Sequence, residues 1–210
     1  MNTRRDVLCG LAASSLPMIG KTAPIKAMLG SRDSFLTNSE IAPTPYAYRI
    51  EYLDATQSTR MPTGIIASNG IIISGEALQR NANSVCGWDD ANCMTNNLEF
   101  RWRYNSISVS APQGTKFSFS WGPQIYFNGE FVGNRSLSPV SPKEVYLFDR
   151  NGGDNLRGRI YWINIENENG LVRAFIPVVD SNGTPCMFDR ISKGFFYDAN
   201  NRGYNAGPKI

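Results

Sequence analysis

The chain has 210 residues, of which 41% are hydrophobic and 19% charged, so it carries enough apolar side chains for a packed core. The net charge of +3 is low and the basic residues form no stripe, which argues against a nucleic-acid ligand. Because the chain contains no histidine, a Ser-His-Asp or Cys-His mechanism cannot be built from it. No run reaches the roughly 20 apolar residues that span a bilayer.

Residues 1–45 are predicted to be an N-terminal tail that ends in a polar linker containing Pro43 and Pro45. Residues 3–8 read Thr-Arg-Arg-Asp-Val-Leu, which is similar to a twin-arginine export motif. A weakly apolar run follows, and Ala27 ends a possible cleavage site. Two interpretations stay open: an export signal that sends the protein to the cell surface, or an arm that docks the domain onto a larger particle such as a virion.

From Tyr46 onward the apolar residues recur with a period of two, which is the strand period. The dipeptide Asn128-Gly129 is typical of a tight type I′ hairpin turn, and Asn169-Gly170 indicates a second hairpin turn. Short strands joined by such turns, without a helical stripe, predict an all-β antiparallel β-sandwich or barrel. The predicted strands are 46–53, 70–78, 98–104, 106–110, 116–121, 124–127, 130–132, 144–148, 159–166, 171–179, 187–188 and 195–197.

The hairpin 159–179 is predicted to be central, because its run from Ile160 to Ile163 is apolar on both faces. Alternation within 98–104 and 116–121 sets aromatic side chains on one face of each strand and polar side chains on the other. We therefore expect three of the tryptophans to lie in the core: Trp102, Trp121 and Trp162.

Several stretches resemble the concanavalin A-like, laminin-G-type jelly-roll modules of bacterial surface proteins and of phage or prophage fibre proteins. The resembling residues are 50–56, 62–65, 145–151, 159–161, 170–180, 183–189, 194–197 and 205–207. The resemblance implies a concanavalin A-like jelly roll over residues 46–208. It implies no single function, because one fold serves many functions.

The concanavalin A-like fold also houses glycan hydrolases, which need two carboxylates on opposite sides of the scissile bond. The family's run Glu-x-Asp-x-x-Glu is absent from this chain. Glu166 and Glu168 approach a turn, and the neighbouring Asp89 and Asp90 would diverge on a strand. The chain is therefore predicted not to be an enzyme, with a glycan hydrolase as the weakest alternative.

Two loops are acidic enough to be considered for calcium, which laminin-G-type modules sometimes carry. The first contains Asp89 and Asp90, and the second contains Asp149 and Asp154. The alternative for each loop is ordinary turn chemistry, in which short acids bond nearby backbone amides. No other cofactor is expected, and no paired CxxC spacing suggests zinc.

Cys86 and Cys93 bracket a short segment that contains Trp88. In an exported protein a disulfide between them would close this segment, whereas in a reducing cytosol both would remain thiols. Both outcomes stay open.

A glycan-binding surface usually pairs an aromatic ring with planar polar side chains. Trp88 is a candidate ring because acids flank it, and the row Glu99, Arg101 and Arg103 is a candidate polar face. The alternatives are a loop anchor packed on the core and a solvated sheet face. The sequence thus favours a non-catalytic recognition module for a glycan or a surface protein, with a structural or assembly domain of a phage or surface fibre as the alternative.

Overall fold

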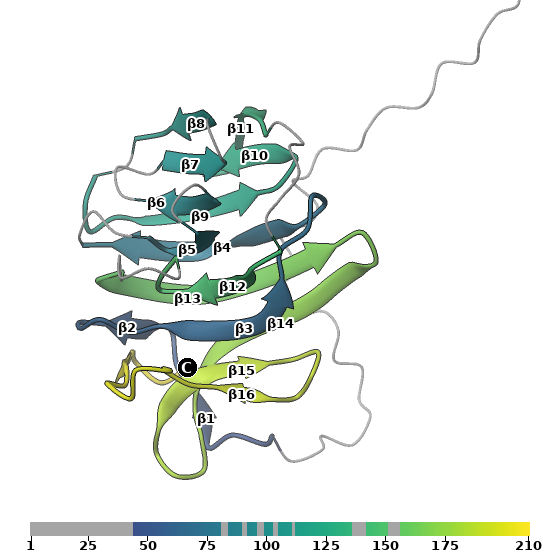
Figure 1. Ribbon diagram of the computed structural model, residues 1–210. Coiled ribbons are helices and arrows are strands. Elements are labelled where there is room, and N and C mark those ends of the chain that lie inside the picture. The colour runs from purple at the N-terminus through teal and green to yellow at the C-terminus, as the bar shows by residue number, and fades with distance from the viewer. Residues whose placement is uncertain are drawn as a thin grey trace, which may run out of the picture. The chain divides into compact units, whose positions relative to one another are not determined.

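The computed structural model describes residues 44–80, 84–89, 92–95, 99–102, 105–110, 112–135, 142–150 and 156–210 (Figure 1). These residues form strands and turns, and no helix occurs among them. The same residues accordingly include no helix long and apolar enough to cross a membrane. The export motif and the arm predicted within residues 1–43 lie outside the described residues.

The larger sheet follows the order β11-β10-β9-β4-β13-β14-β15-β16, and β1, β2 and β17 pair with its strands. Its strands pair antiparallel with one another, and β13 lies between β4 and β14, which confirms the central position of the predicted hairpin. Its strands are β1 (Tyr48–Arg49), β2 (Leu53–Ala55), β4 (Ile72–Gln79), β9 (Lys116–Trp121), β10 (Gln124–Phe127), β11 (Glu130–Asn134), β13 (Gly158–Asn167), β14 (Gly170–Val179), β15 (Pro185–Asp189), β16 (Phe195–Phe196) and β17 (Asn205–Ala206).

The smaller sheet follows the order β3-β12-β5-β6-β7-β8, again antiparallel. The hairpin β5-β6 falls in the segment that the sequence analysis treated as a loop around Trp88, because its residues Cys-Gly-Trp-Asp show no clear alternation. Its strands are β3 (Met61–Ile66), β5 (Cys86–Asp89), β6 (Asn92–Thr95), β7 (Glu99–Trp102), β8 (Asn105–Ser108) and β12 (Glu144–Leu147).

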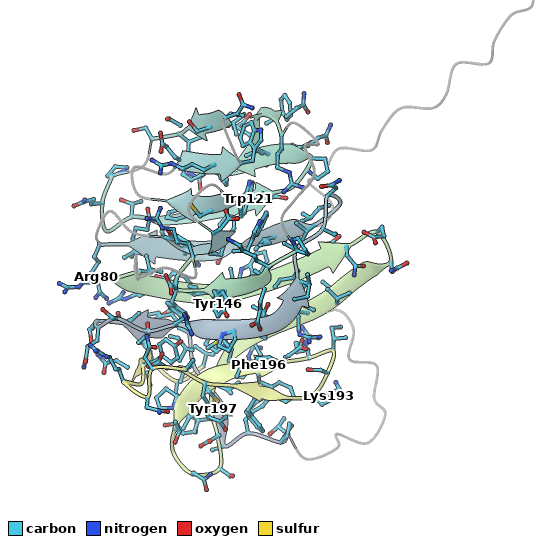
Figure 2. The ribbon with its side chains drawn as sticks, viewed as in Figure 1. Arg80, Trp121, Tyr146, Lys193, Phe196 and Tyr197 are labelled. Atoms are coloured by element: carbon cyan, nitrogen blue, oxygen red, sulfur yellow. The ribbon has the colours of Figure 1, made fainter. Side chains whose placement is uncertain are left out.

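The two sheets pack face to face as a sandwich, and their inner side chains form one main core. Phe117, Phe119 and Trp121 are buried on β9 as the alternation predicted, and Phe100 and Trp102 are buried on β7. Trp121 lies within the sandwich in Figure 2. The all-β antiparallel sandwich predicted from the sequence is thus confirmed.

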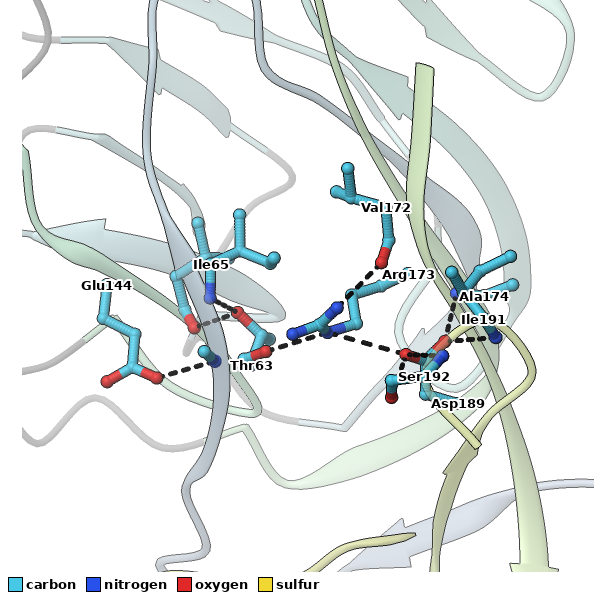
Figure 3. A network of polar contacts seen from close by, with 11 residues as sticks. Thr63, Ile65, Glu144, Val172, Arg173, Ala174, Asp189, Ile191 and Ser192 are labelled. Atoms are coloured by element: carbon cyan, nitrogen blue, oxygen red, sulfur yellow. Dashed lines mark hydrogen bonds and ion pairs between the residues drawn. The ribbon is translucent and has the colours of Figure 1, made fainter. Parts of the chain in front are cut away.

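A polar network joins the two sheets at one edge (Figure 3). The Nε of Arg173 on β14 donates to the carbonyl oxygen of Thr63 on β3 at 3.1 Å and lies 3.6 Å from Oδ2 of Asp189. Asp189 is fully buried and accepts from the backbone N–H groups of Ala174, Ile191 and Ser192 at 2.8, 3.1 and 3.0 Å. This carboxylate therefore fixes β15 to β14 and orients Arg173, which makes the contact with the smaller sheet.

Candidate ligand-binding face

The central strand β13 carries a bulge that decides which side chains reach the surface. Ile160 pairs with Ala77 and Trp162 pairs with Glu76, so Tyr161 is an extra residue opposite β4. Ile160 and Ile163 are buried in the core, whereas the consecutive Tyr161 and Trp162 are half-buried. The prediction of Trp162 in the core is wrong, because the bulge shifts the alternation by one residue and turns its ring outward.

Cross-strand pairing places small polar residues beside this ring. Ser120 on β9 pairs with Ser74 on β4, and Ser74 pairs with Asn164 on β13. In the adjacent row Ser118 pairs with Glu76, which is opposite Trp162. We call nine outward side chains from the middle of these strands and from the neighbouring β10 and β11 the large-sheet face: Ser74, Glu76, Ser118, Ser120, Tyr126, Phe131, Tyr161, Trp162 and Asn164.

A second pair of aromatic side chains bounds the large-sheet face on β10 and β11. Tyr126 pairs with Ser120, and its ring meets that of Phe131 edge-on at 5.7 Å. Phe131 is 53% exposed, which is high for a phenylalanine. The face therefore has aromatic rings on both sides and a floor of hydroxyl and amide groups between them.

The middle of the large-sheet face is electrically neutral. Among these nine side chains the one carboxylate, that of Glu76, lies 2.7 Å from Nζ of Lys116, and the same ammonium sits 4.2 Å from the ring centroid of Tyr161. Glu166, two residues after Asn164 on the same side of β13, places a second carboxylate beside the face. Within the part of the chain that the structure describes, the side chains of Ser74, Ser120 and Asn164 make no hydrogen bond. They are thus available to donate to and accept from a polar ligand.

Trp88 does not lie on a surface. Its side chain is 0% exposed, and its ring stacks on that of Trp121 across the two sheets, with centroids 4.8 Å apart and planes at 16°. This corrects the prediction of an exposed aromatic platform at Trp88. The acidic neighbours misled the prediction, since the ring points from β5 into the core while the chain around it forms a hairpin.

Glu99 and Arg101 lie on β7 of the smaller sheet, opposite in orientation to the buried Phe100 and Trp102. Nη2 and Nε of Arg101 lie 2.6 and 2.7 Å from Oε2 of Glu99, so the two side chains pair with each other. Arg103 lies outside the described residues. A role of this row in ligand binding stays a prediction.

The two cysteines of the β5-β6 hairpin are both buried, and no disulfide joins them. Cys93 pairs with Gly87, and Cys86 pairs with Met94, so the two residues are offset by one position on neighbouring strands. Side chains one residue out of register point to opposite faces of a sheet. Cys86 accordingly belongs to the core cluster, and burial raises the pKa of its thiol. The register argues against the disulfide considered from the sequence.

The calcium candidates divide between described and undescribed residues. Asp89 lies 3.6 Å from Nζ of Lys143, and the buried Asp149 accepts the backbone N–H of Arg150 at 2.7 Å. Asp90 and Asp154 lie outside the described residues. Among those described, no three acidic, cysteine or histidine side chains gather as a metal-binding group. Calcium binding by either loop stays a prediction.

Comparison with known proteins supports the fold. Neither a protein-family model nor a curated protein sequence matches the chain. A solved structure of a "putative carbohydrate binding protein" from Bacteroides ovatus is similar, with a TM-score of 0.52 and 12% sequence identity. The similarity covers 77% of this chain and 62% of the other, so the chain spans less than two thirds of that protein's length. At this identity the similarity establishes the sandwich fold and no more.

Proposed function

We propose that this chain is a non-catalytic carbohydrate-binding module that holds a glycan on the large-sheet face. The observation that carries the proposal is the bulge in β13, which presents the Trp162 ring beside a floor of unpaired hydroxyl and amide groups. The proposed module is a concanavalin A-like or laminin-G-type jelly roll over residues 46–208, preceded by a tail. The similar fold of a protein described as carbohydrate-binding supports this choice of ligand class.

The chemistry of a sugar matches such a face. One side of a pyranose ring presents C–H groups, which pack on the apolar face of an indole or phenol ring. Its hydroxyl groups need partners that both donate and accept, as Ser120 and Asn164 do. Hydrogen bonds to these groups fix the orientation of the ligand, while contact with the rings supplies most of the apolar burial.

Two tyrosines allow a matched test of the proposed face. Tyr126 on β10 donates its hydroxyl hydrogen to Gln124, two residues earlier, at 3.0 Å. Tyr146 on β12, labelled in Figure 2, donates to Glu144, again two residues earlier, at 3.2 Å. Both are half-buried, but they lie on different sheets. We expect the purified chain to bind on a glycan array, and Tyr126→Ala to weaken binding about tenfold, the equivalent of ~1.4 kcal/mol. Tyr146→Ala should bind as the unmodified chain does.

Three other outcomes would indicate a site on the smaller sheet, a structural domain or a hydrolase. Loss of binding in Tyr146→Ala or Arg101→Ala, with Tyr126→Ala unaffected, would move the glycan to the smaller sheet, where Glu99 and Arg101 lie. Absence of binding to every arrayed glycan would contradict the proposal and favour a structural or assembly domain of a fibre. Release of reducing sugar from a bound glycan would instead indicate a hydrolase.

A further inference from the structure

The geometry of the large-sheet face points to a particular shape of ligand. We infer that the glycan is an uncharged, extended chain that crosses the four neighbouring strands β10, β9, β4 and β13 and fills about four sugar subsites, one for each strand. This inference rests on the proposed function and adds the length, direction and charge of the ligand.

The length follows from the spacing of the strands. Tyr126, Ser120, Ser74 and Asn164 form one cross-strand row on four neighbouring strands. Neighbouring strands lie about 4.8 Å apart, so this row is roughly 14 Å long. A sugar unit in an extended chain advances by about one strand spacing. Successive units of a chain lying along the row would therefore meet successive strands.

The direction follows from where the rings are placed. Tyr126 and Phe131 stand at one end of the row; at the other end, on β13, Trp162 stands two residues before Asn164, in the adjacent row. Both ends can then pack against a sugar ring, while the serine side chains between them are too short to obstruct the chain. A ligand running along the strands would meet only one of these two aromatic groups.

The charge follows from the pairing of the ionised groups. Glu76 and Lys116, which lie in the rows beside the cross-strand row, are paired with each other at 2.7 Å, and the four members of the row itself carry no charge. Where β13 pairs with β2, Arg159 lies 3.3 Å from Oδ2 of Asp54, a carboxylate that Arg80 also contacts, and 4.1 Å from the ring centroid of Tyr52. A uronate or sulfated chain would need cations that are free to form charge-assisted hydrogen bonds, and Lys116 beside the row is already paired with Glu76.

The test is a calorimetric titration with β-1,4-glucan, β-1,4-xylan and α-1,4-glucan oligosaccharides, from the disaccharide to the hexasaccharide. For the series that binds, we expect Kd to fall about 100-fold or more up to the tetrasaccharide, which corresponds to ~2.7 kcal/mol. Beyond that length Kd should change less than about twofold. Raising the salt concentration should leave Kd almost unchanged, since screening acts on charged groups.

Variants of the aromatic residues at the two ends of the row distinguish a glycan that crosses all four strands from one that contacts a single end. Trp162→Ala and Phe131→Ala should each weaken the tetrasaccharide about tenfold, whereas Tyr146→Ala should not. Equal affinity for the disaccharide and the hexasaccharide, binding only to insoluble polysaccharide, or strong weakening by salt would each overturn the inference while leaving glycan binding intact. Failure of every oligosaccharide and of the glycan array would overturn the proposed function together with it.

Discussion

Replacing Trp88 with alanine is expected to lower the free energy of unfolding by about 3–5 kcal/mol. The side chain is fully buried and stacks on Trp121 between the sheets, so its removal leaves a large cavity that the two β-sheets cannot close. Urea denaturation followed by circular dichroism measures the loss without depending on the fluorescence of the remaining tryptophans.

Trp162→Ala is the matched control for this prediction. It removes the same side chain from the neighbouring sheet, but the ring is half-buried on the outer face, so the loss should stay below about 1.5 kcal/mol. The structure would be contradicted if the two substitutions were equally destabilising, or if Trp88→Ala were the milder one. That result would return both tryptophans to the positions expected from the sequence.

Asp189→Ala is expected to cost about 3–5 kcal/mol as well, because it breaks a buried charged network. The substitution leaves three backbone N–H groups and the hydroxyl of Ser192 without their acceptor, and Arg173 without its carboxylate. Asp189→Asn keeps one acceptor oxygen and should lose less. Glu130→Ala, which removes an exposed carboxylate from β11, serves as the control and should change stability by less than about 0.5 kcal/mol.

The same carboxylate predicts how stability depends on pH. Burial alone would raise the pKa of Asp189, but hydrogen bonds from Ala174, Ser192 and Ile191 outweigh burial and hold this pKa below 3.8. The pKa of Asp180 is lowered too, by a hydrogen bond from the backbone of Thr184. A carboxyl group whose pKa is lower in the folded chain than in the unfolded chain contributes its full stabilisation at pH values above the unfolded pKa. Stability should therefore fall as the pH drops below about 4, through the folded pKa values. Urea midpoints at a series of pH values should fall less steeply for Asp189→Asn, and an identical slope would contradict this assignment.

The fold could be predicted where local sequence decides the structure. Asn128 and Gly129 have φ angles of 50° and 85° in the turn between β10 and β11, and Gly170 has 102° after Asn169. These left-handed conformations favour asparagine and glycine, so each turn is encoded by its own residues. The strict alternation of β9 likewise encodes which side chains enter the core, because one face of the strand is apolar throughout.

The residues of the candidate site could not be predicted from the sequence, because the register between neighbouring strands determines which side chains face outward. The exposure of Trp162 depends on a bulge opposite β4, and nothing in the run Ile-Tyr-Trp-Ile identifies which residue is the extra one. The burial of Trp88 depends on a hairpin whose strands are short and irregular. The one available signal was the adjacency of Tyr161 and Trp162, since two neighbouring large aromatic residues fit a bulged strand better than a regular one.

The most direct test of the account is fluorine NMR of the chain labelled with 5-fluorotryptophan, which gives one resonance for each of its four tryptophans. The resonances of Trp162 and Trp88 are assigned by their disappearance in Trp162→Phe and Trp88→Phe. On titration with the oligosaccharide that binds most tightly, the Trp162 resonance should shift and saturate, while those of Trp88, Trp102 and Trp121 stay in place. A saturating shift at Trp88 with none at Trp162, or full binding by Trp162→Ala, would contradict a glycan site on the large-sheet face.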